Sequence, residues 1–321
     1  MGRGIDLDTV DCSLLRSKIT DPILSTALTY FREAAVQKSV RRAGDQLDVA
    51  PSAISRQITR LEEELGVSLI DRSARGLGLT EAGTLVLEHA ERSVQEVSDL
   101  RAALLDLRGL RSGRVRVASV EGMAAYFLAR YLAIFEKDNP GITVQLSVIG
   151  SRAVLDALRD RAADMALAFN APTPSPFREH ARLDQPLCLI VAPSHPLATR
   201  KSVSMKELAE CRMALPDESF QIRFLVEHMA ARMGVKLKVA LETNTLETVK
   251  GVVRNSQLVT FLPRYAALRE VSDEDLCAVP LREREFTATR VSLLTSKTVK
   301  LSPAAQALLK TLKAAMATYR G

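Results

Sequence analysis

The sequence predicts an N-terminal winged helix-turn-helix unit, a long connecting helix and a C-terminal α/β domain. Three observations predict this order. Apolar residues recur at spacings of three and four in short segments up to residue 66, and a segment with two glycines and two arginines follows at 72–78. The same helical spacing then continues from residue 80 to about 108. From Arg114 onward, segments of alternating apolar residues take turns with helical segments, which is typical of α/β domains.

The composition is that of a globular protein. The 321 residues suffice for about two or three domains. With 47% hydrophobic and 26% charged residues, disorder is excluded as the main state. No apolar run approaches the roughly 18 residues of a membrane span. Neither an export signal nor a myristoylation pattern follows Met1, so we expect a cytoplasmic protein.

Cysteine and histidine give no sign of a metal or a cofactor. The four cysteines are far apart, without a CxxC pair, and the four histidines are equally scattered. This spacing argues against a zinc site and a disulfide framework, so we expect no cofactor and no metal. The net charge of +6 suits a polyanion partner. However, residues 1–111 hold 15 Lys and Arg against 17 Asp and Glu, so DNA binding would depend on local placement of charge.

Three short helices are predicted up to residue 66. Ser39 can cap the second, and Asp48 lies in the turn after it. Pro51 fits the first position of the third helix, and Gly66 fits the position just after its end. Two short helices joined by a tight turn, the second with Ser, Thr and Arg side chains, have the geometry that enters a DNA major groove. The alternative is a three-helix core whose polar faces are only solvated.

The pattern extends beyond these helices. Ala50–Ile58, Leu61–Arg72 and Leu79–Gly83 together strongly resemble the LysR-type transcriptional regulators. The resemblance implies a winged helix-turn-helix DNA-binding domain over residues 22–80, after an N-terminal extension at 1–21. The DNA-binding residues that we expect are Ser39, Arg41, Arg42, Pro51, Ser52, Ser55, Arg56, Arg60, Arg72 and Arg75.

The chain departs from the family pattern at several positions. Lys38 stands where Gly is common, and Ala50 replaces the Ser that usually caps the recognition helix. Ala43-Gly44 replaces the usual Ala-Ala pair. Glycine inside a helix costs about 0.5–1 kcal/mol relative to alanine. We therefore expect Gly44 to lower the stability of this domain.

A long helix is predicted from Thr80 to about Arg108, with Gly109 at its end. Its apolar residues recur three and four apart, and we expect this stripe to pair with a second copy in a coiled-coil-like dimer. The resemblance implies the same linker and dimerisation role for residues 81–110. The alternative is packing onto a neighbouring domain of the same chain. The stripe comprises Leu87, Ala90, Val94, Val97, Leu100, Leu104 and Leu107.

The alternation of strands and helices from residue 114 predicts parallel sheets with ligand sites at the carboxyl ends of their strands. Two further segments resemble landmarks of the LysR effector domain. They are Pro193–Ala198, which reads Pro-Ser-His-Pro-Leu-Ala, and Thr260–Pro263. The resemblance therefore covers about residues 22–318.

For residues 114–321, the resemblance implies an α/β effector-binding domain of two Rossmann-like lobes, like a type 2 periplasmic-binding protein. Lobe I would comprise residues 114–186 and 288–321, and lobe II residues 187–287. Helix N-termini in the cleft between the lobes would present free N–H groups to an anion or a carbonyl. The matching effector-binding positions are Ser119, Glu121, Gly122, Met123, Gly150, Ser151, Asn170, Ser219, Phe220, Asn244, Thr245 and Thr260.

Some of these positions have simpler interpretations. Ser151 can be only the N-cap of a helix, and Thr260 only a strand residue. Gly122 removes a hydroxyl that many relatives carry, and Glu121 adds an acid. A simple carboxylate effector is therefore less expected here than in the family.

The leading hypothesis is a ligand-responsive transcription regulator that binds promoter DNA as a homodimer or homotetramer, with RNA polymerase as a further partner. A small-molecule effector between the lobes would control DNA binding or activation. An enzyme is not expected, because no GxSxG, HExxH or Walker pattern is present. Two alternatives remain. One is a redox-sensing regulator of the same fold that uses Cys188, Cys211 and Cys277, and the other is a solute-binding protein without a DNA function.

Overall fold

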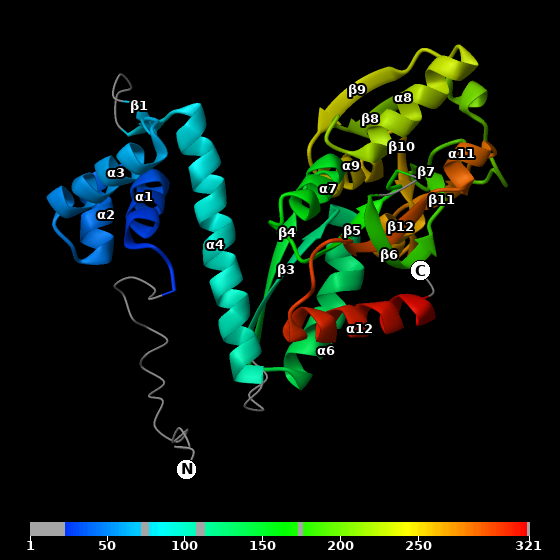
Figure 1. Ribbon diagram of the computed structural model, residues 1–321. Helices are drawn as coiled ribbons and strands as arrows, with labels where there is room; N and C mark the ends of the chain where they lie inside the picture. Colours follow the sequence, from blue (N-terminus) through cyan, green and yellow to red (C-terminus); the bar gives the residue numbers. More distant parts are fainter. Residues whose placement is uncertain (1–22, 72–76, 107–112, 173–175, 320–321) are drawn as a thin grey trace. The chain divides into compact units, whose positions relative to one another are not determined.

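The computed structural model describes residues 23–71, 77–106, 113–172 and 176–319 (Figure 1). The chain divides at Arg101 into two compact units. Each unit has its own buried apolar core. No helix in the described part of the chain is long and apolar enough to span a membrane bilayer.

Three short helices open the N-terminal unit, as the sequence predicts. They are α1 (Thr26–Gln37), α2 (Val40–Leu47) and α3 (Pro51–Leu65). Their apolar faces meet in one core, in which the side chains of Phe31 and Ile54 are fully buried. This burial follows from the helical spacing of the apolar residues, which gathers them on one face of each helix.

The ends of these helices confirm the predicted capping signals. Ser39 Oγ accepts a backbone N–H from the first turn of α2, and Pro51 occupies the first turn of α3. Gly66 ends α3 with a φ of 70°, a conformation that glycine adopts without strain. Lys38 and Asp48 end α1 and α2 in the same left-handed region, with φ of 50° and 56°. A residue with a Cβ atom is strained there.

Gly44 corrects one expectation from the sequence. A Cβ atom at this position would lie 2.8 Å from the carbonyl oxygen of Val49 and 3.3 Å from Cγ of Pro51. The turn and the start of α3 therefore approach α2 more closely than alanine would permit. The expected loss of stability considered only the helix itself, whereas the missing side chain is what allows this close contact.

A two-stranded ribbon follows α3 and leads to the long helix α4 (Glu81–Asp106). Its strands, β1 (Ile70–Asp71) and β2 (Gly78–Leu79), pair antiparallel. The base of the predicted wing is therefore present. Its tip, with Arg72 and Arg75, lies outside the described residues.

Helix α4 begins at the predicted cap. Thr80 Oγ1 accepts the N–H of Gly83 at 2.9 Å, and the Thr80 N–H donates to the carbonyl of Leu69 at 3.1 Å. These two hydrogen bonds join the start of the helix to the base of the wing. The predicted end of the helix near Gly109 lies outside the described residues.

Lobe I of the C-terminal unit is built on a five-stranded sheet with the order β4-β3-β5-β12-β6. Strand β3 runs parallel to β4 and β5, whereas β12 runs antiparallel to β5 and β6. Within this sheet, the expectation of parallel strands therefore holds only for β4, β3 and β5. The bounds are β3 (Gly113–Ser119), β4 (Ile142–Val148), β5 (Met165–Phe169), β6 (Phe177–Asp184) and β12 (Arg290–Ser296).

Helices cover both faces of this sheet. Helix α7 (Ser151–Arg159) contacts β3, β5 and β12. Helix α12 (Pro303–Thr318) contacts β3 and β6 and lies with α6 (Ala129–Asp138) on the other face (Figure 1). The helical segment after β3 is divided. A π-helical segment, η2 (Ala124–Leu128), separates the short α5 (Glu121–Met123) from α6.

Lobe II has an antiparallel sheet of order β10-β7-β11 and a parallel pair, β8 and β9. The strands are β7 (Leu187–Val191), β8 (Arg212–Pro216), β9 (Lys238–Thr243), β10 (Thr260–Pro263) and β11 (Cys277–Pro280). The helices are α8 (Gln221–Met233), α9 (Leu246–Arg254), α10 (Leu268–Ser272) and α11 (Arg284–Thr287), with 3₁₀ turns η3 (Met205–Leu208) and η4 (Arg264–Ala267). Ser204 and Glu207 form a capping box at η3.

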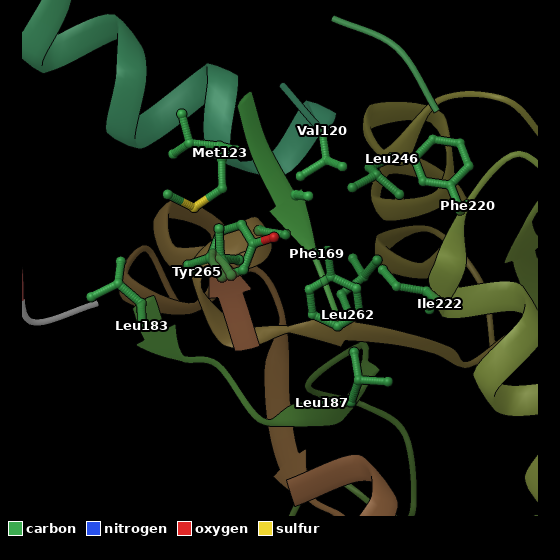
Figure 2. Close-up of a cluster of buried hydrophobic side chains, with 14 of the residues drawn as sticks. Val120, Met123, Phe169, Leu183, Leu187, Phe220, Ile222, Leu246, Leu262 and Tyr265 are labelled. Atoms are coloured by element: carbon green, nitrogen blue, oxygen red, sulfur yellow. The ribbon is translucent and has the colours of Figure 1, made fainter. Parts of the chain in front are cut away.

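The chain passes between the lobes at two adjacent points. Gln185 and Thr289 pair there, because the Gln185 N–H donates to the Thr289 carbonyl at 2.8 Å and Thr289 Oγ1 donates to the Gln185 carbonyl at 2.6 Å. Side chains of both lobes also form one apolar cluster (Figure 2). Its labelled members are Val120, Met123, Phe169 and Leu183 from lobe I, with Leu187, Phe220, Ile222, Leu246, Leu262 and Tyr265 from lobe II.

Candidate DNA-binding surface and effector cleft

The exposed face of α3 carries the residues predicted to read DNA. Ser52, Ser55 and Arg56 are exposed, while Ile54 and Ile58 are buried in the core on the opposite face. Because the buried pair holds the helix on α1 and α2, the polar side chains are presented from a rigid element. The arrangement is that of a recognition helix.

The two arginines of α3 differ in their surroundings. Arg60 Nε lies 2.9 Å from Glu64 Oε1, one turn further along the helix. Arg56 is exposed and has no acidic partner within the described part of the chain. An unpaired guanidinium can pair with a guanine edge or a phosphate without giving up an existing ion pair. Arg56 is therefore the strongest candidate for base contact on this helix.

Other predicted DNA-binding residues lie on α2 or at the start of α3. Ser39 uses its hydroxyl as a helix cap, and the Arg42 guanidinium donates to the carbonyl oxygen of Gln37. Both side chains therefore hold the turn between α1 and α2. Arg41 and Pro51 are exposed.

Glu62 holds the start of the wing in place, and the sequence pattern does not single it out. Its Oε1 accepts the backbone N–H of Leu69 at 2.7 Å and that of Ile70 at 3.2 Å. The contact ties α3 to β1, so it fixes where the wing begins. Glu62 lies within the motif that resembles the LysR family, but three successive glutamates occur there. Spacing alone does not say which of them turns toward the wing.

The predicted dimerisation stripe of α4 divides into two parts. In the first part, Ala90 and Val94 line a shallow depression together with Leu28 of α1, and Leu87 packs against the core of the N-terminal unit. Ala90 is only 1% exposed. This half of the stripe is covered by the chain itself, which is the alternative that the sequence left open.

The second part of the stripe remains uncovered in the single chain. Leu100 and Leu104 are 46% and 51% exposed, although Val97 before them is buried. Leu107 lies outside the described residues. Exposed leucines one turn apart on a long helix favour contact with a second copy.

Predicted effector residues from both lobes meet at the entrance of the cleft. The Ser151 N–H donates to the Ser219 carbonyl at 3.0 Å, and the Gln221 N–H donates to Ser151 Oγ at 3.2 Å. Gly150, not Ser151, is the N-cap of α7, so the interpretation of Ser151 as only a cap is wrong. A Cβ atom at Gly150 would lie 2.7 Å from the Ser219 carbonyl oxygen, and this close approach of the lobes therefore requires glycine.

Two pockets flank this contact. Their volumes are ≈ 610 Å³ and ≈ 380 Å³. Arg152 and Asp156 of α7 line both, so each pocket offers a charged donor and a charged acceptor. The predicted effector residues that line one or the other are Gly150, Ser151, Asn170, Ser219 and Phe220.

Four further predicted effector residues are buried in the C-terminal unit. Ser119, Met123 and Thr260 are fully buried, so no water-sized space lies beside them, and Gly122 is buried as well. Ser119 Oγ donates to the Val120 carbonyl at 3.0 Å. Thr260 Oγ1 has no hydrogen-bond partner within the described residues. A polar atom of β10 is therefore buried and unsatisfied within the described residues.

The remaining predicted positions lie at the start of α9. Thr245 is the N-cap of this helix, and its hydroxyl accepts a backbone N–H of the first turn at 3.3 Å. Asn244 before it is exposed. The Glu121 carboxylate of lobe I reaches the same helix, because both its oxygens lie 3.0 Å from the Leu246 nitrogen. At the start of α9, as at Ser151 and Ser219, predicted effector positions therefore lie where the two lobes contact each other.

Cys188 and Cys277, on neighbouring strands, are too far apart for a disulfide. Cys188, Cys211 and Cys277 are free thiols. Cys188 lies opposite Pro280 and Cys277 opposite Val191, so the two cysteines are three residues out of register, about 10 Å along the strands. That separation exceeds the reach of a disulfide. Burial also raises the pKa of the Cys188 thiol, which disfavours the reactive thiolate.

The fold and these two surfaces define a class of protein, in which a helix-turn-helix DNA-binding domain is joined to a two-lobed ligand-binding domain. Residues 25–84 match the family described as bacterial regulatory helix-turn-helix protein, lysR family, and residues 108–317 match the LysR substrate binding domain. The chain belongs to the LysR family and is a LysR-type transcriptional regulator with an effector-binding domain.

Curated relatives agree with this assignment. The chain is 30% identical to the RuBisCO operon transcriptional regulator of Allochromatium vinosum over 228 residues, which cover 71% of this chain and 75% of that protein. It is 27% identical to a probable nitrogen assimilation transcriptional activator of Synechococcus elongatus, over 87% of this chain and 90% of that one.

Solved structures share the fold. Full-length CbnR in complex with its target DNA has a TM-score of 0.67 at 19% identity, covering 90% of this chain and 98% of that one. The regulatory domain of CcmR from Synechocystis PCC6803, in complex with 2-PG, has a TM-score of 0.57 at 22% identity, covering 64% of this chain and 98% of that one.

Proposed function

We propose that α3 enters the major groove of promoter DNA and that Arg56 contacts a base edge there, with Ser52 and Ser55 beside it. The exposed, unpaired guanidinium of Arg56 is the observation that carries this proposal. Arg41 and Arg60 lie on exposed helix positions and would contact phosphates. Arg72 and Arg75 on the wing complete the proposed set.

The proposed assembly is a homodimer through the uncovered half of the α4 stripe, with a tetramer formed from two dimers. Leu100 and Leu104 carry the dimer proposal, because each exposes about half of a large apolar side chain. Two copies would present two α3 helices to two half-sites on DNA. RNA polymerase is the further partner through which such a regulator would act. We propose that this protein is located in the cytoplasm.

The proposed effector site is the inter-lobe cleft, entered through the two pockets beside Ser151 and Ser219. An effector that binds both lobes would change the population of their closed arrangement, and hence the spacing of the paired recognition helices. This is a binding role, without catalysis. The support is the contact of predicted residues from both lobes at the cleft entrance.

A gel-shift assay tests the DNA-binding proposal. The full-length protein is titrated onto fragments from upstream of its own gene and of the neighbouring genes, at several salt concentrations. We expect a specific complex with at least one fragment, weakening as salt rises because phosphate contacts release counterions. The absence of any specific complex at low salt would contradict the proposal.

A further inference from the structure

The two lobes are joined by a contact between an acid of lobe I and a helix N-terminus of lobe II. Glu121, the first residue of α5, directs both carboxylate oxygens at the N–H of Leu246, the first residue of α9, at 3.0 Å each. The first-turn amides of a helix have no partner within the helix, and they carry partial positive charge. Glu121 therefore lies where an anionic ligand of this helix would bind.

A second contact joins lobe I to the same helix of lobe II one turn further along, this time from η2. Lys250 of α9 is almost completely buried, with a side chain 3% exposed, and its Nζ lies 3.1 Å from the Tyr126 hydroxyl of η2. Nζ also lies 2.7 Å from Glu270 and 2.6 Å from Glu247. Burial favours the neutral amine, but hydrogen bonds to Glu247, Glu270 and Tyr126 outweigh it and raise the pKa of Lys250. Lys250 therefore carries a positive charge, and the carboxylates of Glu247 and Glu270 already balance it.

A side chain of lobe II packs closely against Gly122, the residue after Glu121. Tyr265 of lobe II is 3% exposed, and its Cε2 atom would lie 2.8 Å from a Cβ atom at position 122. Only glycine at position 122 leaves room for this ring. Figure 2 shows the Tyr265 ring within the apolar cluster that also contains Met123 of lobe I.

We propose that Glu121 is a specificity-determining residue that supplies the cleft with its own anion. Together, Glu121, Tyr126, Leu246 and Lys250 form an inter-lobe latch that holds the lobes closed in the effector-free protein. The Glu121 carboxylate accepts the hydrogen bond of the amide at the start of α9. The buried Lys250 already forms ion pairs with acidic side chains of its own lobe. A carboxylate or phosphate effector is therefore excluded from this end of the cleft, and effector groups that meet α9 are neutral or cationic.

This inference rests on the proposed effector function, and it is tested by hydrogen exchange of the full-length chain. The amide of Leu246 is followed in the wild type, in Glu121→Ala and in Glu121→Gln. The control is Glu136→Gln, which neutralises an exposed acid of α6. We expect exchange to become at least about tenfold faster in Glu121→Ala, because a charge-assisted hydrogen bond is lost. A smaller acceleration is expected in Glu121→Gln and none in the control.

Acetate provides the second arm of the experiment. In Glu121→Ala, added acetate can occupy the vacated place at the helix N-terminus, so we expect it to restore protection of the Leu246 amide. Chloride at the same ionic strength should not, and Glu121→Gln should not respond, because its amide still fills the space. Unchanged exchange in Glu121→Ala, or a failure of acetate to restore protection, would overturn the inference.

Two further readouts keep the outcome clear. If Glu121→Ala does not fold, Glu121→Gln decides alone, and exchange equal to that of the wild type overturns the inference. DNA binding of the wild type is measured on the same preparation. If the wild type does not bind DNA, the proposed function is overturned, but the latch is not. If the wild type binds DNA and the Leu246 amide exchanges at the same rate in the Glu121 variants as in the wild type, only the latch is overturned.

Discussion

The carbonyl oxygen of Leu69 lies 2.0 Å from the point where a Cβ atom at Gly83 would be placed. The side chain of Leu69 is fully buried in the helix-turn-helix core, and the same carbonyl accepts the Thr80 N–H. Glycine at position 83 therefore lets the first turn of α4 lie directly against the base of the wing. Through this contact the long helix is fixed to the DNA-binding domain.

Replacement of that glycine is expected to destabilise the N-terminal unit. Gly83→Ala forces the Leu69 carbonyl or α4 to move, at a cost of about 1–3 kcal/mol in the free energy of unfolding. Urea unfolding of the full-length protein measures this. Gly251→Ala is the matched control, because no atom lies within 4 Å of a Cβ there. Since Gly251 is inside α9, its replacement should stabilise by about 0.5–1 kcal/mol. An unchanged free energy of unfolding in Gly83→Ala would contradict the packing described.

The turn after α1 gives a prediction of opposite sign. Lys38 adopts a φ of 50°, which strains a side chain with a Cβ atom. Lys38→Gly should therefore raise the free energy of unfolding by about 0.5–1 kcal/mol, after allowing for the greater freedom of glycine in the unfolded chain. Thermal unfolding checks the sign. Lys137→Gly, in the last turn of α6, should instead destabilise, and a loss of stability in both variants would show that Lys38 is not strained.

The sequence predicted the capped helices well, because their signals are local. Ser39, Pro51, Gly66 and Thr80 lie at helix ends as expected, since each acts on its own backbone or on the next turn. At Gly44 the sequence did not show the need for glycine, because that need comes from a tertiary contact. Only the approach of Val49 shows that a smaller residue is needed there.

The sequence indicated which residues would lie between the lobes, but not the contacts that they make there. The resemblance led to strand ends and helix starts, and the structure brings these together. The resemblance could not show that the Ser151 hydroxyl reaches the other lobe or that Glu121 meets α9. Those contacts join residues 70 and 125 positions apart in the chain. Strand β6 and the π-helical turn at η2 were missed as well, since neither has a strong local pattern.

The proposed dimer contact can be broken by one charge. Leu104→Asp places a carboxylate on the exposed half of the α4 stripe, where a partner copy would have to bury it, so the protein should become monomeric at micromolar concentration. Light scattering measures the mass. Glu91→Lys alters charge at an exposed polar position of the same helix and should leave the oligomer intact. A wild type that is already monomeric would contradict the proposal.

Arg56→Ala should weaken binding to a specific site by about 1–3 kcal/mol and relax the preference for one base pair, as expected for a side chain that pairs with a base edge. Fluorescence anisotropy with the specific site and with its single-base variants measures both effects. Arg92→Ala, on α4, removes a cation away from the recognition helix and should change neither. Weaker binding with unaltered base preference would instead assign Arg56 to a phosphate.

Selection of bound sequences from random double-stranded DNA by the full-length protein tests the central claim most directly, because the operator sequence does not have to be chosen in advance. We expect an enriched motif of two related half-sites, one for each α3 helix of a dimer. Enrichment should fall when Arg56→Ala replaces the wild type. Recovery of no enriched sequence by the wild type at low salt would contradict the claim that this chain reads DNA through α3.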